Sequence, residues 1–416
     1  MVICIIGLGY VGLPLSLAFS SKNIEVIGYD NSLKRVNELK KSIDVNREYS
    51  KSELHGLKNI GFTSKVTNIA KANIYIITVP TPVNKNNTPN LKPLLNASKV
   101  VGKNLSINDI VIYESTVYPG CTEEECVPVL EKFSKMKFNK DFFCGYSPER
   151  INPGDKKRKL KDIIKVTSGS NYEIAHKIDM LYKKIIEAGT HLAPSIKVAE
   201  ASKIIENIQR DVNISLMNEL AIIFNKMGID TTDVLKASST KWNFLNFKPG
   251  LVGGHCIGVD PYYLAYKSKK LGYTPNVILS GRKVNNNMGK HISNTIYNLI
   301  LDNKLNPKNC RALILGVTFK ENCSDIRNSR IFNLNDELIK TGVKVDLYDP
   351  YAVKEEVFKI YKIQLIEEIK IKYDIIILAV AHNSFIKMNL TDFKKTKGII
   401  YDVKSILKKE LISARL

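Results

Sequence analysis

The chain has 416 residues, of which 44% are hydrophobic and 25% are charged, and it carries a net charge of +21 at pH 7. This length exceeds one ordinary hydrophobic core and predicts two or three domains. No apolar run reaches the roughly 18 residues that indicate a transmembrane helix, and the N-terminus lacks the basic segment and cleavage site of a signal peptide. The seven cysteines are scattered without CxxC spacing, which argues against a disulfide framework or a zinc site. We therefore expect a cytoplasmic protein without a bound metal.

The positive charge is typical of proteins that attract an anionic partner, such as nucleic acid, a membrane surface or a phosphorylated metabolite. However, lysines are spread along the chain from Lys22 to Lys409, with only short clusters such as residues 156–159. No basic tail or nucleic-acid-binding motif accompanies them. We interpret most of the charge as a lysine-rich surface, and we expect neither a nucleic-acid nor a membrane partner.

The first stretch of the chain has the pattern of a dinucleotide-binding loop. Val2–Ile6 is an apolar run that predicts a buried strand, and residues 13–19 have the apolar spacing of a helix. Between them lies a G-x-G-x-x-G sequence with its glycines at Gly7, Gly9 and Gly12. We expect the first glycine to permit a tight turn, the second to let the backbone approach a pyrophosphate, and the third to allow close helix–strand packing. The helix N-terminus would then face the negative charge.

A second predicted strand, residues 24–29, ends at Asp30, where the dinucleotide-binding pattern places an acidic residue. Its carboxylate would accept hydrogen bonds from ribose hydroxyls and repel a 2′-phosphate. This favours NAD over NADP, although Arg35 nearby keeps NADP open as an alternative. Tight packing without any ligand is the structural alternative to this interpretation.

Further strands are predicted in an alternating β/α rhythm at residues 73–79 and 109–114. Thr81 and Thr116 follow these strands closely, and Glu149 holds a similar position further along. In a doubly wound sheet the carboxyl ends of the strands contact the ligands. We expect the threonine hydroxyls to contact the cofactor or a reacting water, but ordinary loop or helix-capping threonines fit the pattern as well.

A long amphipathic helix is predicted from about residue 195 to residue 228. Such a helix often connects domains or pairs with a second copy of the chain. Lys203 and Asn207 stand four residues apart and therefore share a face, with Glu200 one turn earlier. These residues are candidates for a site, but a solvent-exposed pair between Glu200 and Lys203 is an equally ordinary explanation.

The segment of residues 253–260 places Cys256 among glycines, with Asp260 four residues later. Glycines let a substrate approach the backbone closely, so the pattern indicates a thiol nucleophile in a close-fitting site. The alternative is a cysteine that is only a small hydrophobic residue.

The rest of the chain predicts a second α/β unit without a G-x-G-x-x-G sequence, which would hold a different ligand. Lys320 and Arg327, in the loop after its first strand, are placed to bind phosphates. The elements predicted here are helices at 276–288 and 331–341 and strands at 310–316, 343–348, 373–380 and 398–403. The predicted fold class is therefore α/β, with two Rossmann-like doubly wound domains joined by a long central helix.

Together these stretches resemble the UDP-glucose/UDP-N-acetylhexosamine (GDP-mannose) 6-dehydrogenase family, across essentially the whole chain. The matching segments are Gly7–Gly12, Glu114–Thr116, Tyr146–Gly154, Lys203 with Asn207, Gly253–Asp260 and Lys320–Ser329. The resemblance implies an NAD-binding domain (1–194), a helical connector with the cysteine loop and the dimer interface (195–290), and a UDP-binding domain (291–416). It also implies a four-electron oxidation of the sugar C6 alcohol to a carboxylate, with two NAD⁺ consumed.

The resemblance assigns roles residue by residue. Cys256 would attack the C6 aldehyde to form a thiohemiacetal and then a thioester, while Lys203 and Asn207 stabilise the oxygen anion. Asp260 and Glu149 would manage protons and the hydrolytic water, which Thr116 supports. The implied cofactor contacts are Gly7, Gly9, Tyr10, Val11, Gly12, Asp30, Arg35, Thr81, Thr116 and Arg327. The implied substrate contacts are Glu149, Arg150, Lys203, Asn207, Phe247, Lys248, Gly253 and Lys320.

Two departures narrow the substrate. UDP-glucose enzymes typically have a lysine where this chain has Val259, and His255 here precedes the cysteine. The sequence of the matching segments is similar to that of the enzymes that act on UDP-N-acetylglucosamine or UDP-N-acetylgalactosamine. Such enzymes supply uronic acids for capsules, O-antigens and other surface polysaccharides. UDP-N-acetylmannosamine is the second candidate and UDP-glucose the third, and the residues do not separate the C4 epimers.

Two other functions remain as alternatives. A hydroxyacid or 6-phosphogluconate type of dehydrogenase would share the glycine loop and the long helix but would need no cysteine. A basic NAD-binding regulator or nucleic-acid binder would show a steep salt dependence of DNA binding.

Overall fold

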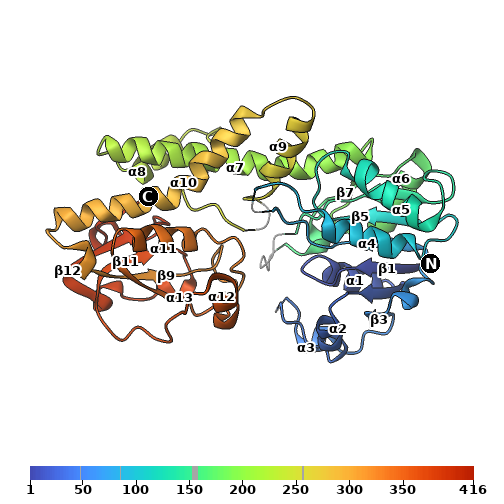
Figure 1. Cartoon of the computed structure of the whole chain (residues 1–416), viewed down its shortest axis with the longest axis horizontal. Coiled ribbons are helices and arrows are strands. Elements are labelled where there is room, and N and C mark those ends of the chain that lie inside the picture. The colour runs from blue at the N-terminus through green and yellow to red at the C-terminus, as the bar shows by residue number, and fades with distance from the viewer. Residues whose placement is uncertain (47, 85, 152–157, 255–256) are drawn as a thin grey trace. The chain divides into compact units, whose positions relative to one another are not determined.

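The computed structural model describes the whole chain except residues 47, 85, 152–157 and 255–256 (Figure 1). The proposed nucleophile Cys256 and the neighbouring His255 therefore lie outside the described residues. The chain forms two compact units, Met1–Glu206 with Tyr262–Tyr273, and Asn207–Pro261 with Thr274–Leu416. Each unit is built around its own parallel sheet.

The sheet of the first unit has six parallel strands in the order β3-β2-β1-β4-β5-β6. This is the strand order of a dinucleotide-binding fold, and it confirms the predicted Rossmann-like unit. Strand interiors are rich in isoleucine, valine and tyrosine, which suits a sheet that is covered on both faces. The strands are β1 (Val2–Ile6), β2 (Glu25–Tyr29), β3 (Ile60–Thr63), β4 (Ile74–Ile77), β5 (Ile110–Tyr113) and β6 (Phe143–Tyr146).

Helices α1 and α6 share one core with the first sheet. Leu13 and Phe19 of α1 and Ile178 of α6 pack with Ile3 and Ile76 of the strands. Strands β7 and β8 pair in a small two-stranded parallel sheet. Along the chain, β7 follows β6 and β8 follows α6. The remaining elements of this part are α1 (Gly12–Ser20), α2 (Leu33–Lys40), α3 (Lys51–Leu54), α4 (Lys92–Gly102), a π-helical turn (Thr122–Cys126), α5 (Val127–Ser134), β7 (Lys165–Thr167), α6 (Tyr172–Lys183) and β8 (Thr190–Leu192).

The predicted long helix is confirmed as α7 (Ile196–Lys226), which continues without a break from the first unit into the second (Figure 1). One stripe of α7 is buried and includes Ala199 and Ile204. Ile205, Leu216 and Ile223 of the same helix are exposed. Exposed large apolar side chains on one long helix are a feature of surfaces that bind a partner.

The second unit has a five-stranded parallel sheet in the order β10-β9-β11-β12-β13, a doubly wound order that also occurs in flavodoxin-like folds. Its elements are α8 (Thr231–Ser238), α9 (Asp260–Lys270, whose residues from Tyr262 group with the first unit), α10 (Asn276–Asp302), β9 (Arg311–Leu315), α11 (Ile331–Lys340), β10 (Lys344–Tyr348), α12 (Lys354–Tyr361), β11 (Tyr373–Leu378), α13 (Asn383–Ile386), β12 (Lys394–Asp402) and β13 (Ala414–Arg415). Single 3₁₀ turns occupy Val66–Ile69, Leu160–Asp162, Pro307–Asn309, Leu390–Phe393 and Lys409–Leu411.

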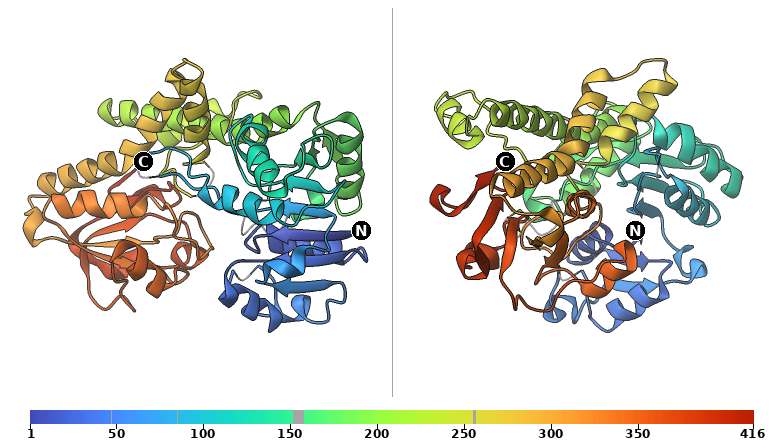
Figure 2. Two further views of the ribbon diagram at one scale, coloured as in Figure 1. Left: turned by 45° about the vertical axis from the view of Figure 1, so that its right-hand side comes forward. Right: turned by 60° about the vertical axis from the view of Figure 1, so that its left-hand side comes forward.

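Helix α10 is longer than the sequence pattern predicts, because it extends beyond residue 288 to Asp302. The polar run Asn285–Asn287 and Gly289 interrupt the apolar pattern. Met288, Ile292, Ile296 and Ile300 nevertheless recur every four residues and are all buried, so tertiary packing carries the helix through. Figure 2 shows α10 and α11 along the C-terminal sheet, with which they share a core.

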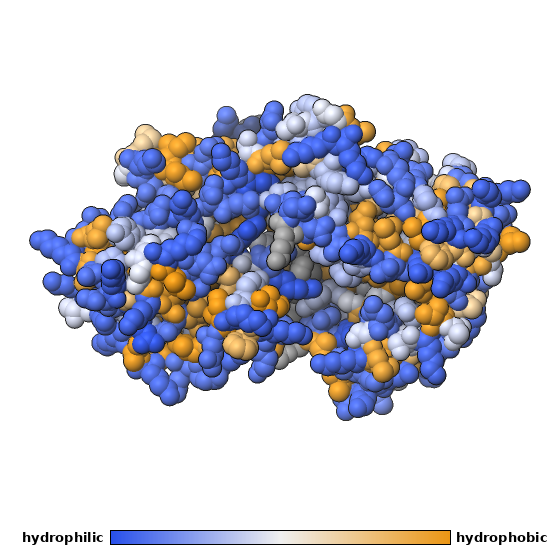
Figure 3. Space-filling model, viewed as in Figure 1, coloured by the Kyte–Doolittle hydropathy of each residue, from blue (hydrophilic) through white to orange (hydrophobic). Residues whose placement is uncertain are grey.

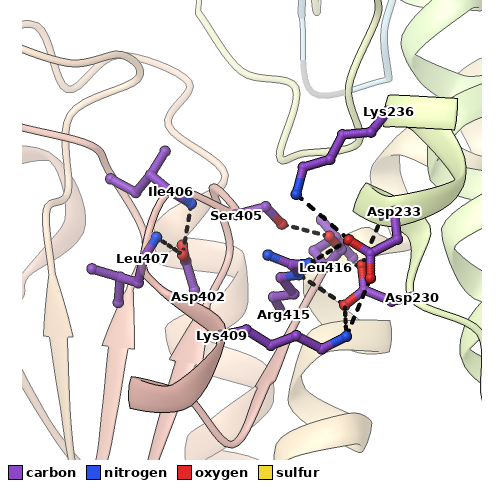
Figure 4. A network of polar contacts seen from close by, with 10 residues as sticks. All are labelled: Asp230, Asp233, Lys236, Asp402, Ser405, Ile406, Leu407, Lys409, Arg415 and Leu416. Atoms are coloured by element: carbon purple, nitrogen blue, oxygen red, sulfur yellow. Dashed lines mark hydrogen bonds and ion pairs between the residues drawn. The ribbon is translucent and has the colours of Figure 1, made fainter. Parts of the chain in front are cut away.

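The end of the chain is tied to α8 by charges (Figure 4). Arg415 of β13 donates from Nε and Nη2 to Asp230 at 3.0 and 2.9 Å. Asp230 is also the N-cap of α8 and accepts the backbone N–H of Asp233. Asp402 accepts the backbone N–H groups of Ile406 and Leu407, which fixes the turn after β12. The bidentate pair of Arg415 with Asp230 therefore links β13, the edge strand of the sheet, to α8 of the connector.

The face of the molecule in Figure 3 is mostly hydrophilic, with hydrophobic residues in scattered patches. Within the described part of the chain, no helix has both the length and the apolar character needed to cross a membrane.

Candidate active site

The glycine loop has the geometry that the sequence predicts. Gly7 has φ +98°, and its N–H donates to the Tyr29 carbonyl at 2.8 Å. A Cβ on Gly12 would lie 1.8 Å from the Gly7 carbonyl oxygen, so the packing excludes any side chain there. A Cβ on Gly9 would meet nothing within 4 Å, which leaves this backbone open to a ligand. No side chain caps α1 at Val11, so this helix N-terminus is open to a pyrophosphate, although the Leu13 N–H already donates to the Gly9 carbonyl.

Asp30 is held at the carboxyl end of β2. Its Oδ2 accepts the N–H of Leu8 at 2.9 Å and its Oδ1 accepts the N–H of Ser32 at 2.8 Å. Arg35 donates from Nε to the Leu8 carbonyl, and its Nη1 lies 2.9 Å from Asp44 Oδ1. Asp44 therefore compensates the charge of Arg35, which favours NAD over NADP. The residues of the loop fit NAD, and their contacts with it stay predictions.

The loops after β4 and β5 are tied together at the same edge of the sheet. Thr81 donates from its hydroxyl to the Thr116 carbonyl at 2.7 Å, and Ser115 donates to the Val79 carbonyl at 2.6 Å. Tyr263 donates to the Thr81 carbonyl at 2.9 Å. The structure thus brings Thr81 and Thr116 together, with the Thr81 hydroxyl committed as a donor.

Glu149 lies at this edge in a group of buried charges that the sequence did not reveal. Its Oε1 accepts the N–H groups of Arg150 and Ile151. Lys165 of β7 places its Nζ 3.6 Å from Glu149 Oε2 and 2.7 Å from Glu114 Oε2. Arg150 itself pairs with Glu206 at 2.8 Å.

The electrostatics of this group are set by burial and by the charges it contains. Burial raises the pKa of Glu114 to about 7, Lys165 opposes that rise, and the charge of Glu149 adds to it. Burial alone would lower the pKa of Lys165, but Glu114 and Glu149 raise it above its usual value. Lys165 is therefore an ammonium ion in the interior of the first unit.

Asn207 and Asp260 meet in the second unit, as expected for residues of one site. Asn207 donates from Nδ2 to Asp260 Oδ2 at 2.5 Å, and both side chains are buried. Asp260 begins α9, the helix that follows the cysteine loop. The structure therefore joins two of the predicted catalytic residues directly.

Lys203 of α7 is 8% exposed and makes no hydrogen bond or ion pair with any residue that the structure describes. The solvent-exposed pair between Glu200 and Lys203 is wrong, because Glu200 is fully buried. Glu200 accepts the N–H groups of Gly120 and Thr122 at 2.5 and 2.9 Å. It therefore caps the turn that starts at Thr122 and does not pair with Lys203.

The glycines before the cysteine pack against the phosphate-binding candidate loop within the second unit. A Cβ on Gly253 would lie 2.5 Å from the Asn328 carbonyl, and Gly254 has φ +85° with a Cβ position 2.8 Å from the Phe319 ring. Gly253, Phe319 and Lys320 line one small pocket. Gly253 and Lys320, both predicted to contact the substrate, therefore lie close together in the second unit.

Three other predicted contacts lie outside the lining of that pocket. Lys248 is exposed and Phe247 is half-buried, both in the loop before Gly250. Arg327 is paired with Asp325 through Nη2 at 2.7 Å. Their roles toward substrate or cofactor stay predictions.

A buried polar group holds the loop that leads to the cysteine. Asn218 of α7 donates to the Gly250 carbonyl at 3.1 Å and accepts the Gly250 N–H at 2.8 Å. It also donates to Asn285 of α10, which in turn donates to Asp211. Arg282 completes the group with a 2.6 Å contact to Asp211. This group was not predicted from the sequence. The signal that could have revealed it is the presence of polar Asp211 and Asn218 within the otherwise apolar stripe of α7.

Three family models together match most of the chain. They are the NAD-binding domain (residues 1–186), the central domain (197–287) and the UDP-binding domain (313–409) of the UDP-glucose/GDP-mannose dehydrogenase family.

Named relatives agree with these matches. The chain is 54% identical to a UDP-N-acetyl-D-glucosamine 6-dehydrogenase of Salmonella typhi, with 100% of this chain and 98% of the relative covered. A protein of the same name from Pseudomonas aeruginosa is 50% identical, with 100% and 99% covered. The structure of a UDP-D-ManNAc dehydrogenase from Pyrococcus horikoshii superposes with a TM-score of 0.88 at 26% identity, with 100% and 98% covered. The chain therefore belongs to the UDP-glucose/GDP-mannose dehydrogenase family of NAD-dependent oxidoreductases that act on nucleotide sugars.

Proposed function

We propose that this enzyme oxidises the C6 alcohol of UDP-N-acetylglucosamine, or of its C4 epimer UDP-N-acetylgalactosamine, to the uronic acid. The two relatives named for UDP-N-acetyl-D-glucosamine are 54% and 50% identical over the whole chain. The P. horikoshii enzyme named for the N-acetylmannosamine sugar is 26% identical and supports the second candidate less strongly. Val259 instead of a lysine places UDP-glucose third. The product would supply surface polysaccharides such as capsules and O-antigens.

The proposed chemistry removes four electrons from one carbon. Bound NAD⁺ serves as the hydride acceptor, once for each of two oxidations. The C6 alcohol loses a hydride and a proton to become an aldehyde, to which the Cys256 sulfur adds as a thiohemiacetal. Loss of a second hydride and proton leaves a thioester. Water then adds to the thioester carbon, the C–S bond breaks, and the thiolate regains a proton.

The side chain of Lys203, which is 8% exposed and has no partner among the described residues, carries this proposal most directly. Its Nζ is not among the buried unpartnered atoms of the described residues, so the amine is open to a ligand. In the proposed site it stabilises the alkoxide and the later oxygen anions of C6. The hydrogen-bonded pair Asn207 and Asp260 adds a donor and a proton carrier. Glu149 accepts the proton of the hydrolytic water, and Thr116 supports that water.

Contact with a phosphate of the nucleotide is proposed for the loops that carry Gly253 and Lys320, which line one small pocket. The exposed apolar residues of α7, including Ile205 and Leu216, support a homodimer, which sedimentation equilibrium of the purified protein tests directly. A monomer at micromolar concentration contradicts that assembly. A cytoplasmic location is supported by the six cysteines of the described residues, all of which are free thiols.

Replacement of the cysteine separates this function from its nearest alternative. In Cys256→Ser, we expect uronic acid formation to fall by at least about a thousandfold, because an alkoxide is neither formed nor expelled as readily as a thiolate. NADH and uronic acid are measured together after mixing with UDP-N-acetylglucosamine. A dehydrogenase of the hydroxyacid or 6-phosphogluconate type needs no thiol for its single oxidation of an alcohol, so unchanged NADH formation in Cys256→Ser, without uronic acid, would support that class instead.

A further inference from the structure

The carboxyl edge of the first sheet holds more charge than the proposed reaction has used. Glu114 follows β5 and Lys165 begins β7, and their side chains are almost fully buried. Glu149, after β6, is 9% exposed. Two carboxylates and one ammonium therefore share an interior site, in which the gain or loss of one proton changes the electrostatic interactions of the other two groups.

Glu114 is the residue that fixes the ammonium. Its Oε2 lies 2.7 Å from Lys165 Nζ, and its Oε1 accepts the hydroxyl of Tyr182 on α6. The Lys165 ammonium also lies over the Tyr182 ring, 5.3 Å from its centre. Both oxygens of Glu114 are thus engaged, and Lys165 is held on two sides.

Glu149 forms a longer ion pair with the same ammonium. Its Oε1 accepts two backbone N–H groups, whereas Oε2 is 3.6 Å from Lys165 Nζ, beyond a normal hydrogen bond. Oε2 accepts no hydrogen bond from the described part of the chain. A buried carboxylate oxygen with a nearby counter-charge but no hydrogen-bond donor can accept a proton from a group that enters the site.

We propose that Glu114 and Lys165 are positioning residues for Glu149, with Glu114 holding the ammonium so that Lys165 orients the Glu149 carboxylate but leaves its Oε2 free as a proton acceptor. This inference rests on the proposed function, in which Glu149 takes a proton from the water that hydrolyses the thioester. Neither residue touches the reacting atoms in this arrangement.

The charged and titratable groups around Glu149 come from four elements. Lys165 faces it from β7, Glu114 from β5 and Tyr182 from α6, while the adjacent Arg150 is neutralised by Glu206 of α7. Without Glu114, the whole attraction of the Lys165 ammonium would act on the Glu149 carboxylate. Without Lys165, the two buried carboxylates would repel each other with no ammonium between them.

The two substitutions should therefore move the hydrolysis step in opposite directions. The decay of the acyl-enzyme is followed by rapid quenching and intact-protein mass spectrometry over a range of pH. In Glu114→Gln we expect the acidic limb of the decay rate to move to lower pH by about one unit or more, and in Lys165→Met to higher pH by a similar amount. The matched controls are Glu187→Gln and Lys161→Met, which dissolve an exposed ion pair in the same unit and should leave the limb in place.

A second measurement needs no substrate. Carboxyl ¹³C NMR of the full chain should show Glu114 titrating with a pKa near 7, and Glu149→Gln should lower that midpoint because one negative charge is removed. If Lys165→Met does not fold, Glu114→Gln and this titration decide the question. A limb that stays in place in Glu114→Gln, or a Glu114 midpoint unmoved by Glu149→Gln, overturns the proposal. Failure of the wild type to form uronic acid would instead refute the proposed function, and the titration would still test the coupling.

Discussion

At the residue scale, burial gives two carboxyl groups of the first unit unusual properties. Burial raises the pKa of Glu114 and of Glu200 to about 7 in both cases. Glu114 has a charged partner in Lys165, whereas Glu200 is satisfied chiefly by backbone N–H groups. One residue is therefore placed to influence a reaction, and the other mainly supports the π-helical turn at Thr122.

Glu200 predicts a pH dependence of stability with a defined sign. Its folded pKa lies above the ordinary value of 4.5, so its contribution is complete below about pH 4.5 and is lost as the pH rises through about 7. The glutamine of Glu200→Gln does not titrate. We therefore expect the free energy of unfolding of this variant, relative to that of the wild type, to rise by roughly 3 kcal/mol as the pH increases from about 4.5 to about 7. Urea unfolding of both proteins at a series of pH values measures the difference. The exposed Glu187→Gln is the control, and a constant difference between wild type and Glu200→Gln would contradict the prediction.

At the element scale, α7 organises the connector through its buried polar residues. Asn218 pairs with both backbone groups of Gly250, much as a neighbouring strand would, and thereby fixes the loop that continues to the proposed nucleophile. Asn207, on the same helix, fixes Asp260 at the start of α9. The segment between Gly250 and Asp260 is thus anchored by α7 at both ends.

Removal of the Asn218 side chain should loosen one anchor. In Asn218→Ala the N–H and carbonyl of Gly250 lose their partners, and we expect the free energy of unfolding to fall by about 1–3 kcal/mol. NADH formation should also fall, because Gly250, at the start of the segment that leads to the cysteine, loses its anchor. Both are measured beside Asn213→Ala, which removes a half-buried amide that bonds only within the same helix and should change stability by less than about 0.5 kcal/mol. Equal effects of the two variants would refute the anchoring role.

At the scale of the whole molecule, two parallel sheets and one long helix follow from local patterns. Apolar runs that end in polar loops predicted most of the long strands, and the glycine loop predicted the cofactor class. Strand β3, with exposed and half-buried positions, lacks such a run and was not predicted. The partnership of Glu114 with Lys165, 51 residues apart, depends on burial and strand order. No spacing rule reports these, so the sequence alone could not place this part of the site.

The activity of the whole molecule is the proposed four-electron oxidation of a UDP-N-acetylhexosamine. The most direct measurement is NADH formed per sugar consumed, with purified enzyme, excess NAD⁺ and four separate substrates: UDP-N-acetylglucosamine, UDP-N-acetylgalactosamine, UDP-N-acetylmannosamine and UDP-glucose. We predict two NADH per molecule of UDP-N-acetylglucosamine or UDP-N-acetylgalactosamine, with uronic acid as the product. One NADH per sugar would contradict the oxidation to the acid. Turnover of only UDP-N-acetylmannosamine or UDP-glucose would contradict the proposed substrate, and no NADH from any of the four would contradict the account as a whole.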